Sequence, residues 1–306
     1  MSEQRRGLLL GITAYGLWGL FPLHWPLLEP AAPAEILAHR IVWSLLFIGV
    51  LVWARRRFST VRSALLDRRT RRVLVIASLV IGCNWFLFIW AVNHNHVVET
   101  SLGYFINPLV SVAMGVVAFG ERLRRLQWAA IAIAASGVLW LTFEYGRPPW
   151  ISIALALSFG TYGLAKKKAN VGAVQSLAVE TMVLAPVALG YLVMLQANGD
   201  AQFGQNGALH TAMLIGTGVV TALPLLCFGA AATRIPLSMI GMLQYLTPTL
   251  QFLIGVLLYE EPMTPARWVG FVIVWAACAV FTVESLGHRR RQLRRAVEPA
   301  SVSQQV

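Results

Sequence analysis

The chain has 306 residues, of which 57% are hydrophobic and only 12% are charged. Soluble domains carry about a quarter charged residues, so this composition excludes a soluble globular protein and indicates a polytopic membrane protein. The formal net charge of +12 would suggest a nucleic-acid partner in a soluble chain. Here the basic residues lie in short gaps between apolar runs, which is the pattern of the positive-inside rule, and we expect no nucleic-acid partner.

Ten apolar runs are long enough to cross a bilayer, since about 20 apolar residues suffice for a helix. The sequence therefore predicts an all-α membrane protein with ten transmembrane helices. The first run follows Arg5-Arg6 and resembles a signal peptide, but its motif GITAYGLWG has a partial copy at 157–163, so we expect a retained helix. The predicted spans are 7–27, 33–54, 73–92, 97–119, 126–143, 150–168, 172–196, 208–231, 237–259 and 266–286.

The basic residues predict the orientation of these helices. With the N-terminus in the cytoplasm, 22 of the 25 lysines and arginines fall in cytoplasmic segments, the opposite loops hold only Arg147 and Arg267, and Arg40 lies within a span. Both termini are therefore expected in the cytoplasm. The basic loop 55–72 predicts an amphipathic helix on anionic lipid, with simple solvation of its charge as the alternative.

The span 97–119 carries a polar stripe through an otherwise apolar helix. Tyr104, Asn107 and Ser111 recur at steps of three and four residues and so share one face. Pro108 removes a backbone donor in mid-span and is expected to act as a hinge. The stripe predicts a wall of a solute cavity. The alternative is hydrogen bonding that only holds neighbouring helices together.

The same arrangement returns 140 residues later in the span 237–259, with Gln244, Thr247 and Gln251 on the stripe and Pro248 as the hinge. Asn107 and Gln244 each offer both donors and acceptors to a solute. A proline in each stripe frees nearby carbonyls, which are tolerated at membrane depth only beside protein or a water-filled cavity.

An internal repeat explains this recurrence. A unit of five spans is odd in number, so its two copies must be inverted relative to each other, which is the architecture of many secondary transporters. We expect a first repeat over 1–146, an inverted second repeat over 147–286 and a basic cytoplasmic tail over 287–306. The matching pairs at an offset of 140 are Pro108 and Pro248, Glu121 and Glu261, and Trp128 and Trp268.

Four stretches carry a resemblance to a known family: AYGLWGLFPLHW (14–25), EILAHRIVWS (35–44), NWFLFIWAVNHNHVVETSLGYFINPL (84–109) and LQYLTPTLQF (243–252). Together with the ten spans, they resemble the EamA branch of the drug/metabolite transporter superfamily, and within it the RarD-type permeases. The resemblance implies a multi-pass permease of the bacterial inner membrane that carries small organic metabolites or drugs. It also implies a solute site between spans one, three, four, six, eight and nine, and it defines no particular substrate.

Ionisable residues within a span are candidates for function, because burying them in hydrocarbon is costly. Arg40 can bind a carboxylate in a fork geometry, and the alternatives are that it snorkels outward or pairs with a buried acid. Glu180 lies near the repeat position of His39 and is expected either to take up a proton or to pair with Arg40 or His39. Glu99 follows a loop with two histidines and is a candidate for proton relay from the periplasm, with simply solvated histidines as the alternative. His39 is a further candidate for proton coupling.

Aromatic side chains are candidates to line a pocket for a flat or apolar solute, and interfacial anchoring is the alternative for the tryptophans. The candidates are Tyr15, Trp18, Trp85, Trp90 and Tyr162. The small residues of spans five and ten are expected to pack away from the solute pathway, supporting the bundle or a homodimer contact.

Other function classes have weaker support in the sequence. An intramembrane enzyme would need a motif such as HExxH or paired aspartates within spans, and the chain has neither. We therefore expect no catalytic residue, no metal and no cofactor. A passive facilitator, a channel or a membrane sensor is the alternative to active transport. The expected partners are a small-molecule solute and the lipid bilayer.

Overall fold

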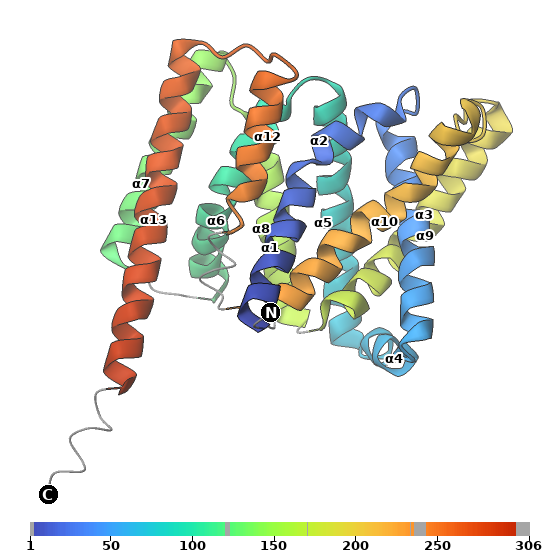
Figure 1. The fold of residues 1–306 in the computed structure, drawn as a ribbon, viewed down its shortest axis with the longest axis horizontal. Coiled ribbons are helices and arrows are strands. Elements are labelled where there is room, and N and C mark those ends of the chain that lie inside the picture. Colours follow the sequence, from blue (N-terminus) through green and yellow to red (C-terminus); the bar gives the residue numbers. More distant parts are fainter. Residues whose placement is uncertain (1–2, 120–122, 170, 233, 236–242, 298–306) are drawn as a thin grey trace, which may run out of the picture. The chain divides into compact units, whose positions relative to one another are not determined.

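The structure is a computed structural model that describes residues 3–119, 123–169, 171–232, 234–235 and 243–297 (Figure 1). Within those residues all regular secondary structure is helical, which confirms the all-α prediction for the described part of the chain. The helices are α1 (Glu3–Gly19), α2 (Phe21–His24), η1 (Pro26–Leu28), α3 (Pro33–Ala54), α4 (Phe58–Leu66), α5 (Arg68–Asn93), α6 (Val97–Phe119), α7 (Arg125–Tyr145), α8 (Trp150–Ala169), α9 (Ala173–Asn198), α10 (Gly207–Ala232), α12 (Leu246–Leu257) and α13 (Pro265–Val297).

Among the described residues, six helices are long and apolar enough to cross a membrane: α3, α5, α7, α9, α10 and α13. The bent pair formed by α1 with the segment Phe21–Leu28, which turns by 48°, gives a seventh. Helices α6 and α8 cover the fourth and sixth predicted spans, and the shorter α12 covers part of the ninth. The count of ten transmembrane helices therefore stays a prediction, because part of the ninth span lies outside the described residues.

Local sequence signals explain where several helices begin and end. Pro33 occupies the first turn of α3, where its missing N–H has no helical partner to lose. The Asp67 carboxylate caps α5 by accepting a hydrogen bond from the Thr70 amide at 2.8 Å, and hydrogen bonding by Thr70 lowers the pKa of Asp67. Helices α7 and α9 end at Gly146 and Gly199 in the left-handed conformation that glycine adopts without strain.

The two prolines predicted as hinges occupy different positions in their helices. Pro108 lies inside α6, which continues as one helix from Val97 to Phe119. Pro248 lies in the first turn of α12, immediately after a turn at Gln244 and Tyr245. A proline costs little in a first turn because its missing N–H would have no helical acceptor there.

The chain forms two compact units. Unit 1 comprises residues 1–114 and 150–262, and unit 2 comprises residues 115–149 and 263–306. In unit 1, α3 packs against α9 and α10, α5 against α8, and α1 against α10 and α12. In unit 2, α7 packs against α13. Each compact unit thus contains segments from both predicted repeats.

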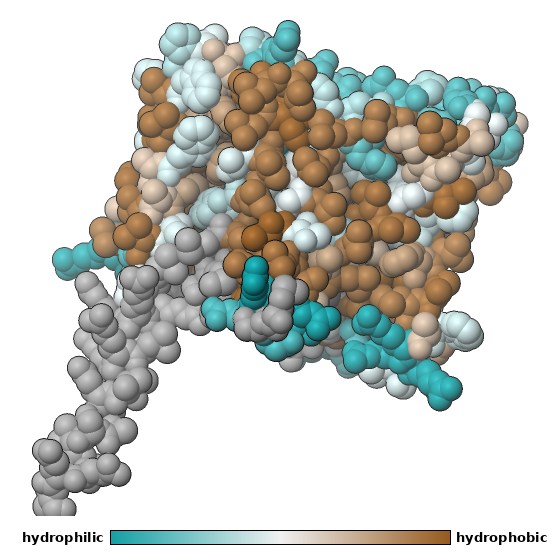
Figure 2. All heavy atoms as spheres, in the orientation of Figure 1, coloured by the Kyte–Doolittle hydropathy of each residue, from teal (hydrophilic) through white to brown (hydrophobic). Residues whose placement is uncertain are grey.

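The exposed surfaces of the helices suit a lipid environment. Figure 2 shows hydrophobic residues along the lengths of the helices, with hydrophilic residues gathered near their ends. Large apolar side chains are exposed on several of these faces, including Trp53 of α3 at 68% and Val187 of α9 at 76%. Contiguous exposure of this kind is rare in soluble monomers and marks contact with another apolar phase.

Helix α10 approaches α3 closely at a glycine. A side chain added at Gly218 would collide with the backbone of Trp43, whereas one added at Gly216 meets nothing within 4 Å. Replacement of Gly218 with alanine should therefore destabilise the fold by about 1–3 kcal/mol. Replacement of Gly216 with alanine should stabilise it by about 0.5–1 kcal/mol through helix propensity. Thermal unfolding of the two purified variants measures both effects, and an equal shift would contradict the close contact.

Candidate functional site

Arg40 is buried in unit 1, and its side chain is surrounded by aromatic rings. The residue is 4% exposed, and its Nε donates a hydrogen bond to Thr221 Oγ1 on α10 at 2.9 Å. The guanidinium carbon lies 4.2 Å from the ring centroid of Trp85, 5.2 Å from Trp25 and 5.8 Å from Phe21. Four parts of the chain therefore hold the guanidinium in place: α3, α10, α5 and the segment that follows α1.

No carboxylate neutralises Arg40 in the described part of the chain, where none lies within 4.0 Å of its nitrogen atoms. Cation–π contacts and one hydroxyl compensate only part of the cost of burying a charge. Two more polar ring atoms close by, Nε2 of His24 and Nε1 of Trp25, are buried without a hydrogen-bond partner in the described residues. Buried polar groups without a hydrogen-bond partner need an explanation, and the binding of a further polar group at this position would provide one.

Helix α6 brings Tyr104, one residue of its polar stripe, toward the same region. The ring of Tyr104 packs edge-on against Phe88 of α5 at 5.7 Å and against Phe159 of α8 at 6.3 Å. Tyr104 also lies close enough to Arg40 for the two groups to interact electrostatically. Asn107, one turn further along, is 2% exposed. The side chain of Ser111 lies outside the described residues.

The second predicted stripe is engaged with α1. Thr247 Oγ1 donates to the carbonyl of Tyr15 at 2.7 Å, and Gln251 Nε2 donates to the carbonyl of Trp18 at 3.2 Å. These bonds join α12 to α1, as expected if the stripe holds neighbouring helices together. The other end of the Gln251 amide, Oε1, is buried without a partner in the described residues, and Gln244 lies half-buried in the turn before α12.

Four of the aromatic candidates lie in three places. Tyr15 and Trp18 pack together with ring centroids 5.4 Å apart, and both contact Phe228 of α10. Trp85 lies against Arg40. The ring of Tyr162 packs against Phe159, which also contacts Tyr104, and the Tyr162 hydroxyl donates to Glu180.

Glu180 is the centre of a second buried cluster, formed by α8 and α9. Its carboxylate accepts hydrogen bonds from Ser176 Oγ at 2.5 Å and from Tyr162 Oη at 3.0 Å, and it pairs with Lys166 Nζ at 3.1 Å. Glu180 is fully buried, and Lys166 is about a quarter exposed. Of the expected partners for Glu180, neither Arg40 nor His39 is found, and the carboxylate is satisfied within its own cluster.

His39 lies beneath the loop that follows α9. Its ring stacks on Phe203 with centroids 4.8 Å apart, and its Nδ1 accepts a hydrogen bond from Trp43 Nε1 at 3.2 Å. Its Nε2 lies 3.9 Å from Glu35 Oε1, and this oxygen accepts a hydrogen bond from the amide of Gln202 at 2.8 Å. His39 and Glu35 therefore fasten this loop to the first turns of α3.

Two carboxylates cap helices within unit 1. Glu99, the relay candidate, is 4% exposed, and its Oε1 accepts a hydrogen bond from the amide of Ile151 at the start of α8 at 3.2 Å. Glu261 accepts from the amides of Val97 and Val98 at the start of α6, at 2.5 and 3.0 Å. A carboxylate at this position satisfies free N–H groups and interacts favourably with the helix dipole.

Sequence reasoning did not identify several of these partners. Thr221, Phe203, Lys166 and Ser176 contact the candidate residues, and none was singled out beforehand. A spacing of four residues was an available signal for Ser176 and Lys166. Ser176 precedes Glu180 by four residues and therefore shares its helix face, and Lys166 follows Tyr162 by the same step. The other contacts join residues more than 160 positions apart, and no local pattern encodes them.

Comparisons with known proteins agree with this fold. The model of the EamA-like transporter family matches residues 5–143 and again residues 149–283. Protein RarD of Streptomyces exfoliatus is 53% identical over 96% of this chain and 93% of its own length. Protein RarD of Escherichia coli K12 is 42% identical over 95% of this chain and 98% of its own length.

More distant matches extend the same result. The chloramphenicol-sensitive protein RarD of Pseudomonas aeruginosa is 31% identical over 97% of this chain and all of its own length. A crystal structure with 19% sequence identity superposes with a TM-score of 0.60 and covers 92% of this chain and 98% of the other, which shows a shared fold. Given two family matches that together span most of the chain and relatives that match almost end to end, the chain is a RarD-type member of the EamA-like transporter family.

Proposed function

We propose that this membrane transporter is a secondary carrier that moves small organic solutes bearing an anionic group across the bacterial inner membrane by alternating access. Arg40 carries this proposal. A guanidinium that is buried, fixed by four segments and lacking a carboxylate partner in the described residues is a ready-made site for a solute anion. The surrounding rings of Phe21, Trp25 and Trp85 suit the apolar part of such a solute.

The proposed solute site extends from Arg40 to the neighbouring aromatic and amide groups. Tyr104 approaches it from α6, and we propose that Asn107, one turn further along and also buried, extends it. The residues of α1 and of the second stripe form its other side in this proposal, with the free end of the Gln251 amide as the available acceptor. The complete proposed set is Tyr15, Trp18, Arg40, Trp85, Tyr104, Asn107, Ser111, Tyr162, Gln244, Thr247 and Gln251.

Contacts within unit 2 support the proposed inverted repeat on which alternating access depends. At the offset of 140 residues, Arg124 corresponds to Thr264 and Glu144 corresponds to Glu284. The structure pairs Arg124 with Glu284, and Thr264 donates to Glu144 Oε1 at 2.6 Å. The two bonds join corresponding positions with the repeats exchanged, and this supports a two-fold relation between them.

The packing of unit 1 repeats in the same way. If each span corresponds to the one five places later, the contact of α1 with α10 corresponds to that of α8 with α5. The contact of α3 with α10 likewise corresponds to that of α9 with α5, which is also present. If the two repeats share these contacts, each repeat can adopt the conformation of the other. Such an exchange would open the solute site first to one side of the membrane and then to the other.

A proton step at Glu180 completes the proposal. A carboxylate held by Lys166 and two hydroxyls can release its partners when it is protonated. Its cluster joins α8 to α9 through Tyr162 and Lys166, so protonation would loosen this side-chain contact between the two helices. His39 and Glu99 remain the other proposed proton-coupling residues, and each would have to give up the contacts described above.

Counterflow in proteoliposomes tests the carrier. Vesicles loaded with a small panel of solutes (a dicarboxylate, a zwitterionic amino acid, a cationic amine and chloramphenicol) are assayed for uptake of the same labelled solute. A carrier shows saturable uptake that is accelerated by solute on the opposite side of the membrane. We expect this acceleration for the solutes of the panel that bear a carboxylate. Replacement of Asn107 with alanine and of Gln244 with alanine should weaken it. Flux without trans-acceleration would favour the passive facilitator instead.

A further inference from the structure

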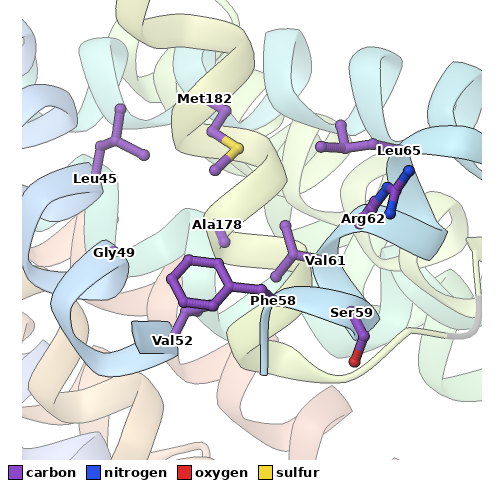
Figure 3. Close-up of a pocket in the computed structure, with 10 residues that line it drawn as sticks. All are labelled: Leu45, Gly49, Val52, Phe58, Ser59, Val61, Arg62, Leu65, Ala178 and Met182. Atoms are coloured by element: carbon purple, nitrogen blue, oxygen red, sulfur yellow. The ribbon is translucent and has the colours of Figure 1, made fainter. Parts of the chain in front are cut away.

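A groove outside the proposed solute site lies between α3, α4 and α9 (Figure 3). Its volume is about 500 Å³, which is within the range of small-molecule sites in proteins. Figure 3 shows side chains from the three helices around one open space, with Arg62 on α4 at its edge. The lining residues are Leu45, Gly49, Val52, Phe58, Ser59, Val61, Arg62, Leu65, Ala178 and Met182.

The wall formed by α4 is built into the fold. Val61 and Ala64 are buried against the cluster that also contains Ala178 of α9. Gln175 Nε2 donates to Thr60 Oγ1 at 3.4 Å, and Arg71 donates to the carbonyl of Leu65 at 2.9 Å. The short helix is therefore fastened both to α9 and to the start of α5, and the groove has a defined shape.

Exposed apolar surface lies beside the groove on both α3 and α9. On α3, Leu46, Val50 and Trp53 adjoin the lining positions in sequence and are 59%, 58% and 68% exposed. On α9, the lining residue Met182 is 42% exposed. Because these neighbouring surfaces are apolar and exposed, a molecule dissolved in the bilayer can enter the groove from the side.

The segment that carries the α4 wall of the groove is strongly basic, and Arg62 lies at the groove itself. Residues 55–72 contain eight arginines and one acidic residue, Asp67. Arg62 is exposed on α4 and makes no ion pair within the described residues. Three further arginines, at positions 55–57, form the connection from α3 to α4. An apolar groove with a basic segment along one wall, at the end of a membrane helix, is complementary to a lipid with an anionic headgroup.

We propose that this groove binds an anionic phospholipid, with one acyl chain between α3, α4 and α9 and the phosphate held by Arg62. The lipid supplies the apolar atoms that fill the groove and the negative charge that would pair with Arg62. The site would fix the position of α4 against α9. Because α9 also carries Glu180, the lipid would stabilise the helix that the proposed proton step uses.

Native mass spectrometry of the purified full-length chain in detergent tests this site. The probes are phosphatidylglycerol and phosphatidylcholine with identical acyl chains. The wild type should bind phosphatidylglycerol at least about fivefold more tightly, and Arg62→Gln should remove about that factor, as expected for one arginine near a lipid surface. Arg125→Gln, which changes an exposed arginine in unit 2, is the matched control and should retain the preference.

Two variants at one position test the acyl chain. A side chain added at Gly49 meets nothing within 4 Å, so both variants should fold, and an unchanged melting temperature in lipid-free detergent verifies this. Gly49→Leu fills the groove and should weaken the binding of both lipids severalfold, whereas Gly49→Ala should bind as the wild type does. Photo-crosslinking from the acyl chain should label α3, α4 and α9.

Three outcomes would overturn the proposal. The first is equal affinity of the wild type for the two lipids. The second is an equal loss in Arg62→Gln and Arg125→Gln, which would indicate general surface charge rather than a site. The third is unchanged binding in Gly49→Leu, or crosslinks that fall outside the three helices.

Discussion

Replacement of Arg40 with methionine should abolish solute exchange and leave the protein as stable as the wild type or more stable. Arg40 is buried in unit 1 without a carboxylate partner in the described residues. A charge buried in this way opposes folding, and replacement of buried ionic groups by apolar side chains of similar volume is often neutral or stabilising by about 1–4 kcal/mol. Methionine has a similar length and can occupy the space between the rings of Trp85 and Trp25.

The loss of exchange should be large because the solute anion would enter a buried site with no partner. Removal of one member of a buried ion pair costs about 3–5 kcal/mol, which corresponds to a loss of affinity of more than about 100-fold. Arg40→Lys should recover only part of the activity, since an ammonium group lacks the planar fork that a carboxylate matches. Counterflow of a dicarboxylate and thermal unfolding, measured on the same preparation, give both quantities.

A cation–π contact elsewhere in the chain supplies the control. The guanidinium carbon of Arg267 lies 4.5 Å from the ring centroid of Tyr145 in unit 2. Arg267→Met should leave exchange unchanged and reduce stability slightly. If Arg40→Met instead lost more than about 2 kcal/mol of stability, and the surviving protein still exchanged solute, Arg40 would be a structural residue and the proposed site would be wrong.

Replacement of Glu180 with alanine should be among the most destabilising single changes in the chain. It would leave the ammonium of Lys166 without its counterion and the hydroxyls of Ser176 and Tyr162 without their acceptor. Breaking a buried pair from one side costs about 3–5 kcal/mol. The additional replacement of Lys166 with methionine should restore part of this loss, and a double-mutant cycle on melting temperature in detergent measures the coupling.

The conservative change Glu180→Gln separates stability from proton coupling. Glutamine keeps an acceptor for Ser176 and Tyr162 but cannot take up a proton, so this variant should fold, exchange solute and no longer respond to an imposed pH gradient. A gradient response equal to that of the wild type would exclude Glu180 from the proton step. A melting temperature within a degree of the wild type in Glu180→Ala would show that the cluster contributes little to stability.

The sequence alone predicted the helices well because membrane helices are defined by local hydrophobicity. The bounds 33–54 and 97–119 coincide with α3 and α6, and the basic loop 55–72 does contain a short helix, α4. An apolar run of sufficient length can satisfy its backbone only as a helix in lipid, so no distant residue is needed to decide its structure. The ninth span was predicted less well, because the chain turns at Gln244 and Tyr245 before α12 begins.

The sequence also determined that this protein is a membrane transporter of the EamA type, and it named Arg40 and Glu180 as groups that are costly to bury. Only the tertiary structure decided what compensates each charge: aromatic rings and Thr221 around Arg40, and Lys166 with two hydroxyls around Glu180. The tertiary structure likewise showed that Glu99 accepts a hydrogen bond at the start of α8 and that Thr247 donates one to the backbone of α1. These partners come from helices that are distant in sequence, and their meeting depends on how the helices pack, which hydrophobic periodicity does not encode.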